Sequence, residues 1–473
     1  MKNEALTLNN RKSVFLWVVF LIFGLYDLVY VLNIDHHVLV GDSWRYVRNF
    51  LLPYYDGSLG ISDLYSDHHP SPLPALAFLL NAVLFNLNMN IELVLGALAK
   101  IVSAGLILLY FQNLSKHKSI ISSFGILITL LTIYPMWSYH WSVLSFNNVF
   151  SLILLGHFLL LDTLLRNLGQ FDFRNKYFLM SCVYSAMMIA VARDYAYIGI
   201  VSTSVFLLLL FILTRARSYF YCSLSQLIIL FLGKLTFNFF GIAESSLVPD
   251  YLERILANMS NIVNTFTLSM LAGAVPLNLL EKTIGEVGTL IVSYLLVLFC
   301  MILTFIYLRN EHWKRTSLPV ILIVYVFIFC LATIAFRYLP EPKLTVWGEV
   351  PARYIPIYSL GFVAFWWIFF ELTTKSKRVW KVVGLSLVLV QANFLFRNDM
   401  DAWNKIPGVN QRHDRASLEV FKQGMNDIPR DRLPIFGGNY PNGPQLDLLR
   451  DEALNVFNEK LMSESIEEYI RSQ

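Results

Sequence analysis

The chain has 473 residues, of which 56% are apolar and only 15% charged, and its formal net charge is +4. Soluble proteins carry roughly a quarter charged residues, so this composition argues against a single water-soluble domain. The small charge does not indicate a nucleic-acid partner. The four cysteines all fall inside apolar runs, which favours neither a disulfide framework nor a thiolate metal cluster. We therefore expect an all-α polytopic membrane protein.

Apolar runs recur from residue 14 to residue 396. Each is close to the ~20 residues that a helix needs to cross a bilayer. We predict eleven transmembrane helices, at residues 14–33, 92–113, 120–138, 144–164, 178–193, 195–214, 219–239, 287–308, 318–337, 354–373 and 380–396.

The distribution of basic residues predicts the orientation. If the N-terminus is cytoplasmic, the short inner segments contain 17 lysines and arginines, whereas the longer outer loops contain far fewer. The run 72–89 is also apolar, but counting it as a span would invert every later loop against this rule. We therefore expect residues 72–89 to form a helix at the outer membrane interface. The C-terminus is then predicted to lie outside.

Three segments of real length face the outside in this topology: 34–91, 240–286 and 397–473. We predict a transmembrane domain over residues 1–396, in which the outer loop 34–91 carries the site. The tail 397–473 changes composition and is expected to form a small soluble C-terminal domain. Its stretch 446–470 has apolar residues at helical spacing.

The first outer loop gathers the side chains best suited to chemistry. It contains the run Asp42-Ser43-Trp44-Arg45-Tyr46 and, later, the turn Tyr65-Ser66-Asp67-His68-His69-Pro70. A carboxylate at the membrane surface can act as a general base, and a guanidinium matches phosphate oxygens in two-pronged fashion. The alternative is a short charged interfacial helix with an internal Asp42–Arg45 pair.

The order of these residues resembles the GT-C superfamily of membrane glycosyltransferases. Its bacterial aminoarabinose transferases and protein O-mannosyltransferases carry Asp-Glu-x-Arg-Tyr in this loop, whereas here the second acid is replaced by Ser43. The resemblance covers the first ~165 residues and the span plan. It implies an inverting enzyme that uses a polyprenyl-phosphate sugar on the outer face, with Asp42 as the catalytic base. From the chemistry of the loop we also predict that Arg45 binds the donor phosphate and that four further residues contact substrate: Tyr46, Asp67, His68 and His69.

Two further groups of charged and aromatic residues lie at the predicted outer ends of membrane spans. The last outer loop contains Glu349 and the pair Arg353-Tyr354. We predict that Arg353 and Tyr354 bind the donor phosphate and that Glu349 contacts substrate. The alternative for Arg353 is a side chain that extends to lipid headgroups.

The pair Arg193-Asp194 occupies a very short outer turn between two apolar runs. Charges at membrane depth are usually paired or functional. We therefore expect Arg193 to bind the donor phosphate and Asp194 to contact substrate. For Lys100 and Lys234, inside or near the ends of apolar runs, we expect the ammonium groups to extend to the membrane surface. Asn147 and Asn148 open the fourth span where related enzymes often have an acid.

No cofactor and no essential metal is expected. Asp67-His68-His69 and Asp399-Met400-Asp401 offer ligand types, but a metal site needs three or four converging ligands. With a monophosphate leaving group, arginines can supply the charge stabilisation that a divalent ion supplies elsewhere.

The function that we predict is transfer of a sugar, glucose as the best guess, from a polyprenyl phosphate to a periplasmic glycan such as lipopolysaccharide O-antigen. Serotype-modifying O-antigen glucosyltransferases have this size and plan. Such systems imply two functional partners, a donor-synthesising glycosyltransferase and a small flippase, in a bacterial inner membrane. The alternatives are an O-antigen polymerase or ligase with a diphosphate-linked donor, and a lipid-linked sugar flippase or transporter. Transporters usually show inverted repeats, which the sequence does not display.

Overall fold

The computed structural model describes residues 2–34, 39, 42–65, 72–115, 120–133, 142–167, 175–239, 251–335, 354–373, 378–425 and 443–472. All regular secondary structure in these segments is helical, which confirms the predicted all-α class. The long helices are α1 (Lys2–Leu32), α5 (Met89–Leu114), α7 (Ser142–Arg166), α8 (Lys176–Thr214), α9 (Arg217–Phe239), α12 (Leu277–Arg309), α14 (Ile355–Thr373) and α15 (Arg378–Met425). The shorter ones are α2 (Asp42–Tyr46), the π-helix η1 (Val47–Leu51), α3 (Leu52–Tyr55), the 3-10 helix η2 (Asp63–Tyr65), α4 (Pro72–Phe85), α6 (Ile120–Leu131), α10 (Tyr251–Ala257), α11 (Met259–Ala272), η4 (His312–Lys314), α13 (Leu318–Thr333), α16 (Gly443–Asp451), η7 (Asn455–Phe457) and α17 (Glu464–Ser472).

Several of these helices have the length and composition of membrane spans. Within the described ranges, eight helices are long and apolar enough to cross a bilayer. Large apolar side chains on their outward faces, such as Leu25, Phe231 and Leu295, are each 60% exposed. Contiguous apolar surface of this kind is stable against lipid but not against water. The chain is therefore a multi-pass membrane protein.

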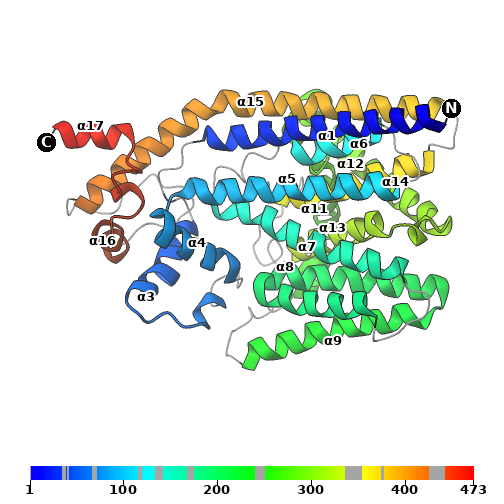
Figure 1. Ribbon diagram of the computed structural model, residues 1–473, viewed down its shortest axis with the longest axis horizontal. Coiled ribbons are helices and arrows are strands. Elements are labelled where there is room, and N and C mark those ends of the chain that lie inside the picture. Colours follow the sequence, from blue (N-terminus) through cyan, green and yellow to red (C-terminus); the bar gives the residue numbers. More distant parts are fainter. Residues whose placement is uncertain are drawn as a thin grey trace.

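The helices form two packed parts, a long bundle and a smaller unit at one of its ends (Figure 1). The bundle is built around α5, α7, α8, α13 and α14, which share the largest core. The smaller part, here called the head unit, consists of residues 42–65 and 72–89, the last turns of α15 and residues 443–472. It has its own core, in which Trp44, Phe50 and Phe78 pack with Phe421 and Phe457.

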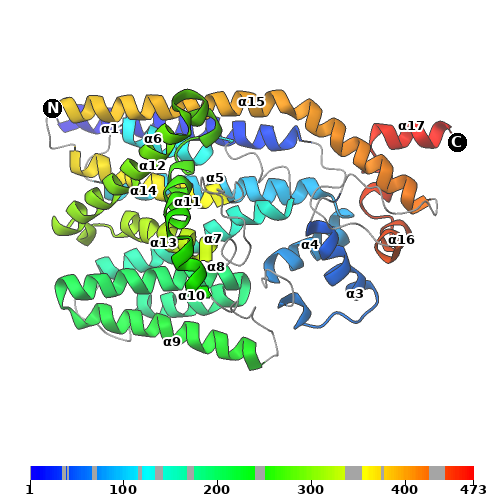
Figure 2. The same cartoon turned by 180° about the vertical axis from the view of Figure 1, so that it is seen from behind.

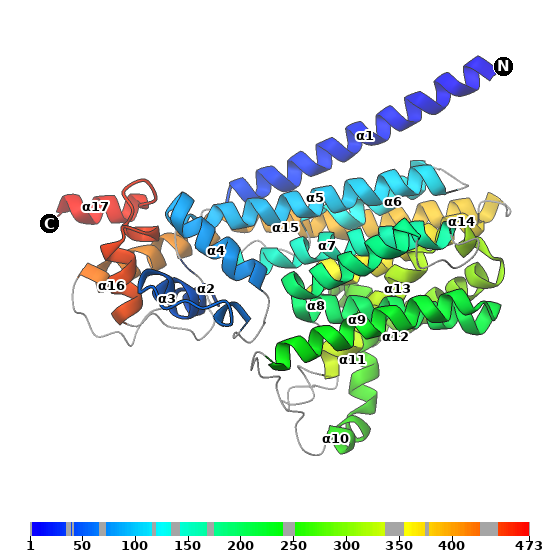
Figure 3. The same ribbon diagram turned by 60° about the horizontal axis from the view of Figure 1, so that its bottom comes forward.

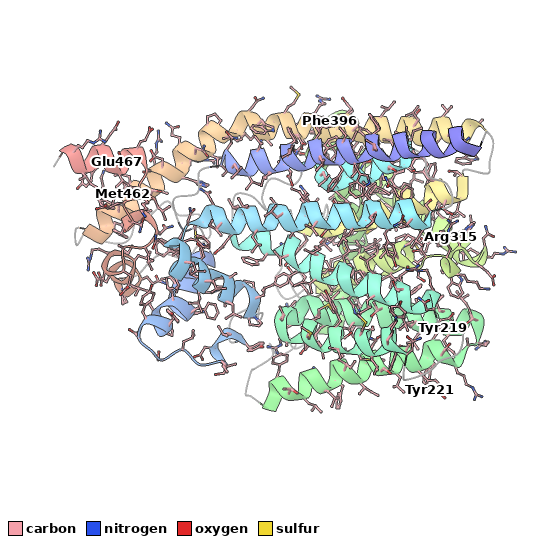
Figure 4. The ribbon with its side chains drawn as sticks, viewed as in Figure 1. Tyr219, Tyr221, Arg315, Phe396, Met462 and Glu467 are labelled. Atoms are coloured by element: carbon pink, nitrogen blue, oxygen red, sulfur yellow. The ribbon has the colours of Figure 1, made fainter. Side chains whose placement is uncertain are left out.

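The two ends of the bundle differ in composition. The end that carries the head unit is called the head end. At the opposite end, called the basic end, helices begin or finish at basic residues, among them Arg166, Lys176, Arg215, Arg217 and Arg309. In Figure 4, Arg315 and Tyr219 lie toward the basic end, whereas Met462 and Glu467 lie in the head unit.

Helix α15 joins the bundle to the head unit without a break. It runs for 48 residues and passes through position 396, where the sequence suggests a domain boundary. The C-terminal helices α16 and α17 share their core with the first-loop helices (Figure 3). The tail 397–473 was expected to form a small separate domain. Its described helices instead pack with the first-loop helices in one core.

Helix α8 reverses direction at Ala192, whose backbone angles are not helical (φ −130°, ψ 23°). Ser185 and Thr203 lie several turns before and after this kink, yet both contact the ring of His157, at 3.5 Å and 3.4 Å. A straight helix would separate them by roughly 27 Å. The two arms of α8 therefore lie side by side and correspond to the predicted spans 178–193 and 195–214.

Helix α11 runs across the bundle helices rather than along them (Figure 2). Along α11 and the turn that follows it, Thr267 accepts a hydrogen bond from Ser293 of α12, and Phe266 packs edge-on against Phe327 of α13. The Ala274 carbonyl accepts from Gln391 of α15. A Cβ at Gly273 would lie 2.5 Å from the backbone of Tyr358, so only glycine permits this crossing of α14.

Candidate functional site

The first outer loop places its predicted residues on one short helix. Asp42 is the first residue of α2, and Arg45 lies within it. The Arg45 side chain is half-buried, and its Nε and Nη2 atoms are shielded from solvent. The Tyr46 ring packs edge-on against Phe50 and Phe78 inside the head-unit core, so this ring has a packing role.

Two buried amide side chains from the C-terminal helices hold the first loop. Gln445 Nε2 donates a 2.8 Å hydrogen bond to the backbone carbonyl of Trp44 in α2. Asn455 Nδ2 donates to the carbonyl of Leu87 at 3.0 Å, and the Asn455 N–H donates to Asn86. Asn86 and Leu87 form the turn between α4 and α5 and both have positive φ. The head unit is thus tied together by contacts between the two ends of the sequence.

The first loop also reaches the tip of α8. Tyr65, the last residue of η2, donates a 2.9 Å hydrogen bond to the Ala190 carbonyl. Its ring centroid lies 5.0 Å from that of Phe237, near the end of α9. Burial raises the pKa of the Tyr65 phenol, so it remains a hydrogen-bond donor at neutral pH.

Arg193 contacts the same Phe237 ring. Its guanidinium carbon is 4.8 Å from the centroid of the Phe237 ring, a cation–π distance, and the residue is only 2% exposed. Asp194, the next residue, is exposed. Phe237 thus contacts both Arg193 and Tyr65, the first residue of the turn in which substrate contacts are predicted.

An aromatic row continues from the α8 tip to the start of α14. Tyr354 precedes α14 and contacts Phe329 of α13, with ring centroids 5.3 Å apart. Phe329 stacks at 5.9 Å on Tyr195, which stacks at 4.4 Å on Phe150 of α7. The Tyr195 hydroxyl donates to the side-chain oxygen of Asn147. Tyr354 and Arg193, predicted from separate loops, therefore lie near the same packed cluster.

The side-chain amide of Asn148 is a buried donor at this end of the bundle. Asn148 is 3% exposed, and its Nδ2 has no hydrogen-bond acceptor among the residues that the structure describes. An unmade hydrogen bond of this kind costs about 1–3 kcal/mol. Such a group is a candidate for contact with a ligand oxygen.

Five predicted site residues lie outside the described segments: Asp67, His68, His69, Glu349 and Arg353. Their roles remain predictions.

The expectation for Lys100 was wrong. Its side chain is 12% exposed and does not extend to the membrane surface. Instead its ammonium group lies 3.1 Å from Asp27 of α1 and 2.8 Å from the carbonyl of Thr132. Asp399 accepts from the neighbouring Ile133 N–H at 3.2 Å. This network pins the end of α6, and an acid inside the first apolar run was the sequence signal that could have revealed it.

The ligand types considered for a metal have other contacts where they are described. Asp399 takes part in the network above, and Asp401 forms an exposed pair with Lys405 at 2.5 Å. Among the described residues, no three His, Cys, Asp or Glu side chains are grouped closely enough to hold an ion. The four cysteines are free thiols.

Comparisons with known proteins do not identify a family. No family model matches the chain, and neither a curated protein nor a solved structure matches it.

Proposed function

We propose that the chain is an inverting glycosyltransferase that moves a sugar from a polyprenyl phosphate to a glycan acceptor at the head end of the bundle. The observation that carries this proposal is the convergence at that end: η2 of the first loop is hydrogen-bonded to the α8 tip, where Arg193 is buried against Phe237. A buried guanidinium is suited to a phosphate, because its charge acts in a medium of low dielectric.

The proposed topology has eleven spans. The eight long helices give nine crossings when the two arms of α8 are counted separately, and the shorter helices α6 and α13 add two. Helix α4 is left out because it packs in the head unit and exposes Leu76, Leu80 and Leu84, as an interfacial helix would. The basic end faces the cytoplasm and the head unit faces the periplasm, by the positive-inside rule.

In the proposed reaction, the acceptor hydroxyl oxygen attacks the anomeric carbon of the donor sugar. The Asp42 carboxylate takes the hydroxyl proton as the new carbon–oxygen bond forms. The bond between the anomeric carbon and the phosphate oxygen breaks, and its electron pair leaves with polyprenyl phosphate. Attack from the face opposite the phosphate inverts the anomeric configuration.

The charge that develops on the leaving phosphate needs cations nearby. Arg193 and Arg45 supply them from the α8 tip and from α2, and Arg353 supplies a third from the segment before Tyr354. Preorganised positive groups in a poorly hydrated site stabilise a phosphate leaving group without a metal ion. A donor-synthesising glycosyltransferase and a small flippase would deliver the lipid-linked sugar to this face of a bacterial inner membrane.

The test is turnover by purified protein with a panel of polyprenyl-phosphate sugars, with glucose first, and O-antigen glycan as acceptor. We expect release of polyprenyl phosphate in step with glycan modification. Asp42→Asn should lower kcat by about 10²–10⁴-fold, because an amide cannot accept the proton. Asp56→Asn is the matched control, since Asp56 is an exposed carboxylate in the same loop.

Three results would overturn the proposal. One is equal turnover by the Asp42→Asn and Asp56→Asn proteins. The second is turnover with diphosphate-linked donors alone, which would indicate a polymerase or ligase. The third is donor movement across vesicles without glycan modification, which would indicate a transporter.

A further inference from the structure

We infer that the C-terminal helices are part of the catalytic machinery, and that Gln445 is a positioning residue that sets the placement of α2 and hence of Asp42 and Arg45. This inference rests on the proposed function. It assigns to the C-terminal segment a role in the reaction itself.

The contact that carries it is buried at both ends. Gln445 is 3% exposed and Trp44 is 1% exposed, and the hydrogen bond between them joins α16 to α2 across almost the whole sequence. A buried amide–carbonyl bond fixes both distance and direction. Trp44 stands two residues after Asp42 and directly before Arg45, so a shift of the Trp44 carbonyl displaces both.

Helix α2 depends on such a contact because it cannot hold its own position. It has only five residues and continues directly into the π-helix η1, whose wider turn interrupts the regular α-helical hydrogen bonding. Isolated helices of fewer than about 12 residues are marginal in water. The placement of α2 is therefore set by tertiary contacts, and Gln445 supplies a directional one.

The C-terminal segment that carries Gln445 is itself rigidly attached. Asn455 binds the α4–α5 turn through two hydrogen bonds, and Phe457 stacks on Phe421 of α15 at 5.5 Å. Helix α15 continues into the bundle. Two sets of contacts thus link α2 to the bundle, one through α15 and one through the start of α5.

The same geometry offers a matched control. Asn455 and Gln445 are both buried amides that donate to first-loop carbonyls, but Asn455 holds the α4–α5 turn and Gln445 holds α2. Loss of either should loosen the head unit. Only loss of Gln445, and not loss of Asn455, should misplace α2.

The experiment compares Gln445→Ala, Gln445→Glu and Asn455→Ala in the full-length purified protein. Misplacement of a reacting group by about 1 Å can lower turnover by about a hundredfold. We therefore expect Gln445→Ala to lower kcat by about ten- to a hundredfold while the donor KM stays within about threefold. Asn455→Ala should lower the melting temperature at least as much as Gln445→Ala does, but its kcat should stay within about threefold of wild type. Hydrogen exchange should show α2 amides exposed by Gln445→Ala and protected in Asn455→Ala.

Gln445→Glu gives a readout that a merely structural role would not move. An ionised carboxylate cannot donate to the Trp44 carbonyl, but a protonated one can. The kcat ratio of this variant to wild type should therefore rise as pH falls, whereas the ratio for Gln445→Ala should stay flat.

Loss of kcat that tracks loss of melting temperature equally in Gln445→Ala and Asn455→Ala would overturn the inference. So would a flat pH ratio for Gln445→Glu. In either case an active wild type leaves the proposed function intact. A wild type inactive with every donor refutes the proposed function and takes this inference with it.

Discussion

The two ends of the bundle differ in whether their buried polar groups have hydrogen-bond partners within the part of the protein that the structure describes. At the basic end, the carboxylate of Asp162 is fully buried and accepts hydrogen bonds from the Ser317 and Leu318 N–H groups, the Tyr110 hydroxyl and Arg166. Glu371 accepts from Ser115 at 2.7 Å in the same region. Helix α7 thereby caps the start of α13, and the polar groups are satisfied internally.

At the head end, the side-chain amide of Asn148 is buried and its Nδ2 has no acceptor among the described residues. A buried donor that the protein does not satisfy can donate to a ligand, whereas the buried carboxylate of Asp162 is occupied by the protein itself. This contrast is the reason to place chemistry at the head end.

The largest expected effect comes from breaking the basic end. Asp162→Ala removes the carboxylate that accepts from the buried Ser317 and Leu318 N–H groups and pairs with Arg166, which should destabilise the protein by about 3–5 kcal/mol. We expect a lower melting temperature and a poor yield of monodisperse protein. Glu311→Gln is the control, since the Glu311–Lys314 pair at the same end is exposed and should contribute little. Equal melting temperatures for the two variants would contradict this view of the basic end.

The next effect comes from the head end and concerns turnover. Arg193→Ala should lower kcat by about a hundredfold with a small loss of stability, because it removes a charge that stabilises the leaving phosphate. Arg193→Lys should be intermediate, since lysine keeps the charge but loses the two-pronged fit. Arg353→Ala is expected to behave like Arg193→Ala. Arg48→Ala, at an exposed first-loop arginine, is the control, and turnover lost equally in it would point to general loop charge.

The smallest effect sharpens the comparison. Asn148→Leu replaces a buried unmatched amide by an apolar group of similar size, so it should leave the melting temperature unchanged or raise it. If Asn148 donates to substrate, KM should rise by about three- to tenfold. Thermal unfolding and steady-state kinetics on the same sample separate the two effects. A fall in melting temperature with unchanged KM would mean that the amide is matched internally.

Local sequence patterns predicted much of this fold. Apolar run lengths located the long helices, and the charged pair Arg193-Asp194 marked the reversal beside Ala192. The patterns failed where a residue depends on a distant partner. Lys100 was expected to reach the surface because its partner Asp27 lies 73 residues away in another apolar run, and the sequence does not show that the two meet. Gln445 carries no signal at all, since its partner is a backbone carbonyl in α2. Position 396, where composition changes and a domain boundary was predicted, lies inside α15, because the helix continues across it.

The central claim is that sugar transfer takes place at the head end, outside the membrane. It is tested by reconstituting the protein in vesicles of known orientation, established by labelling Asp56→Cys in the head unit and Glu311→Cys at the basic end with an impermeant maleimide. Polyprenyl-phosphate glucose is placed in the bilayer and glycan acceptor on one side only. The account predicts transfer only when acceptor is on the side where Asp56→Cys is labelled, and none with Asp42→Asn. Transfer with acceptor on the Glu311→Cys side would contradict it.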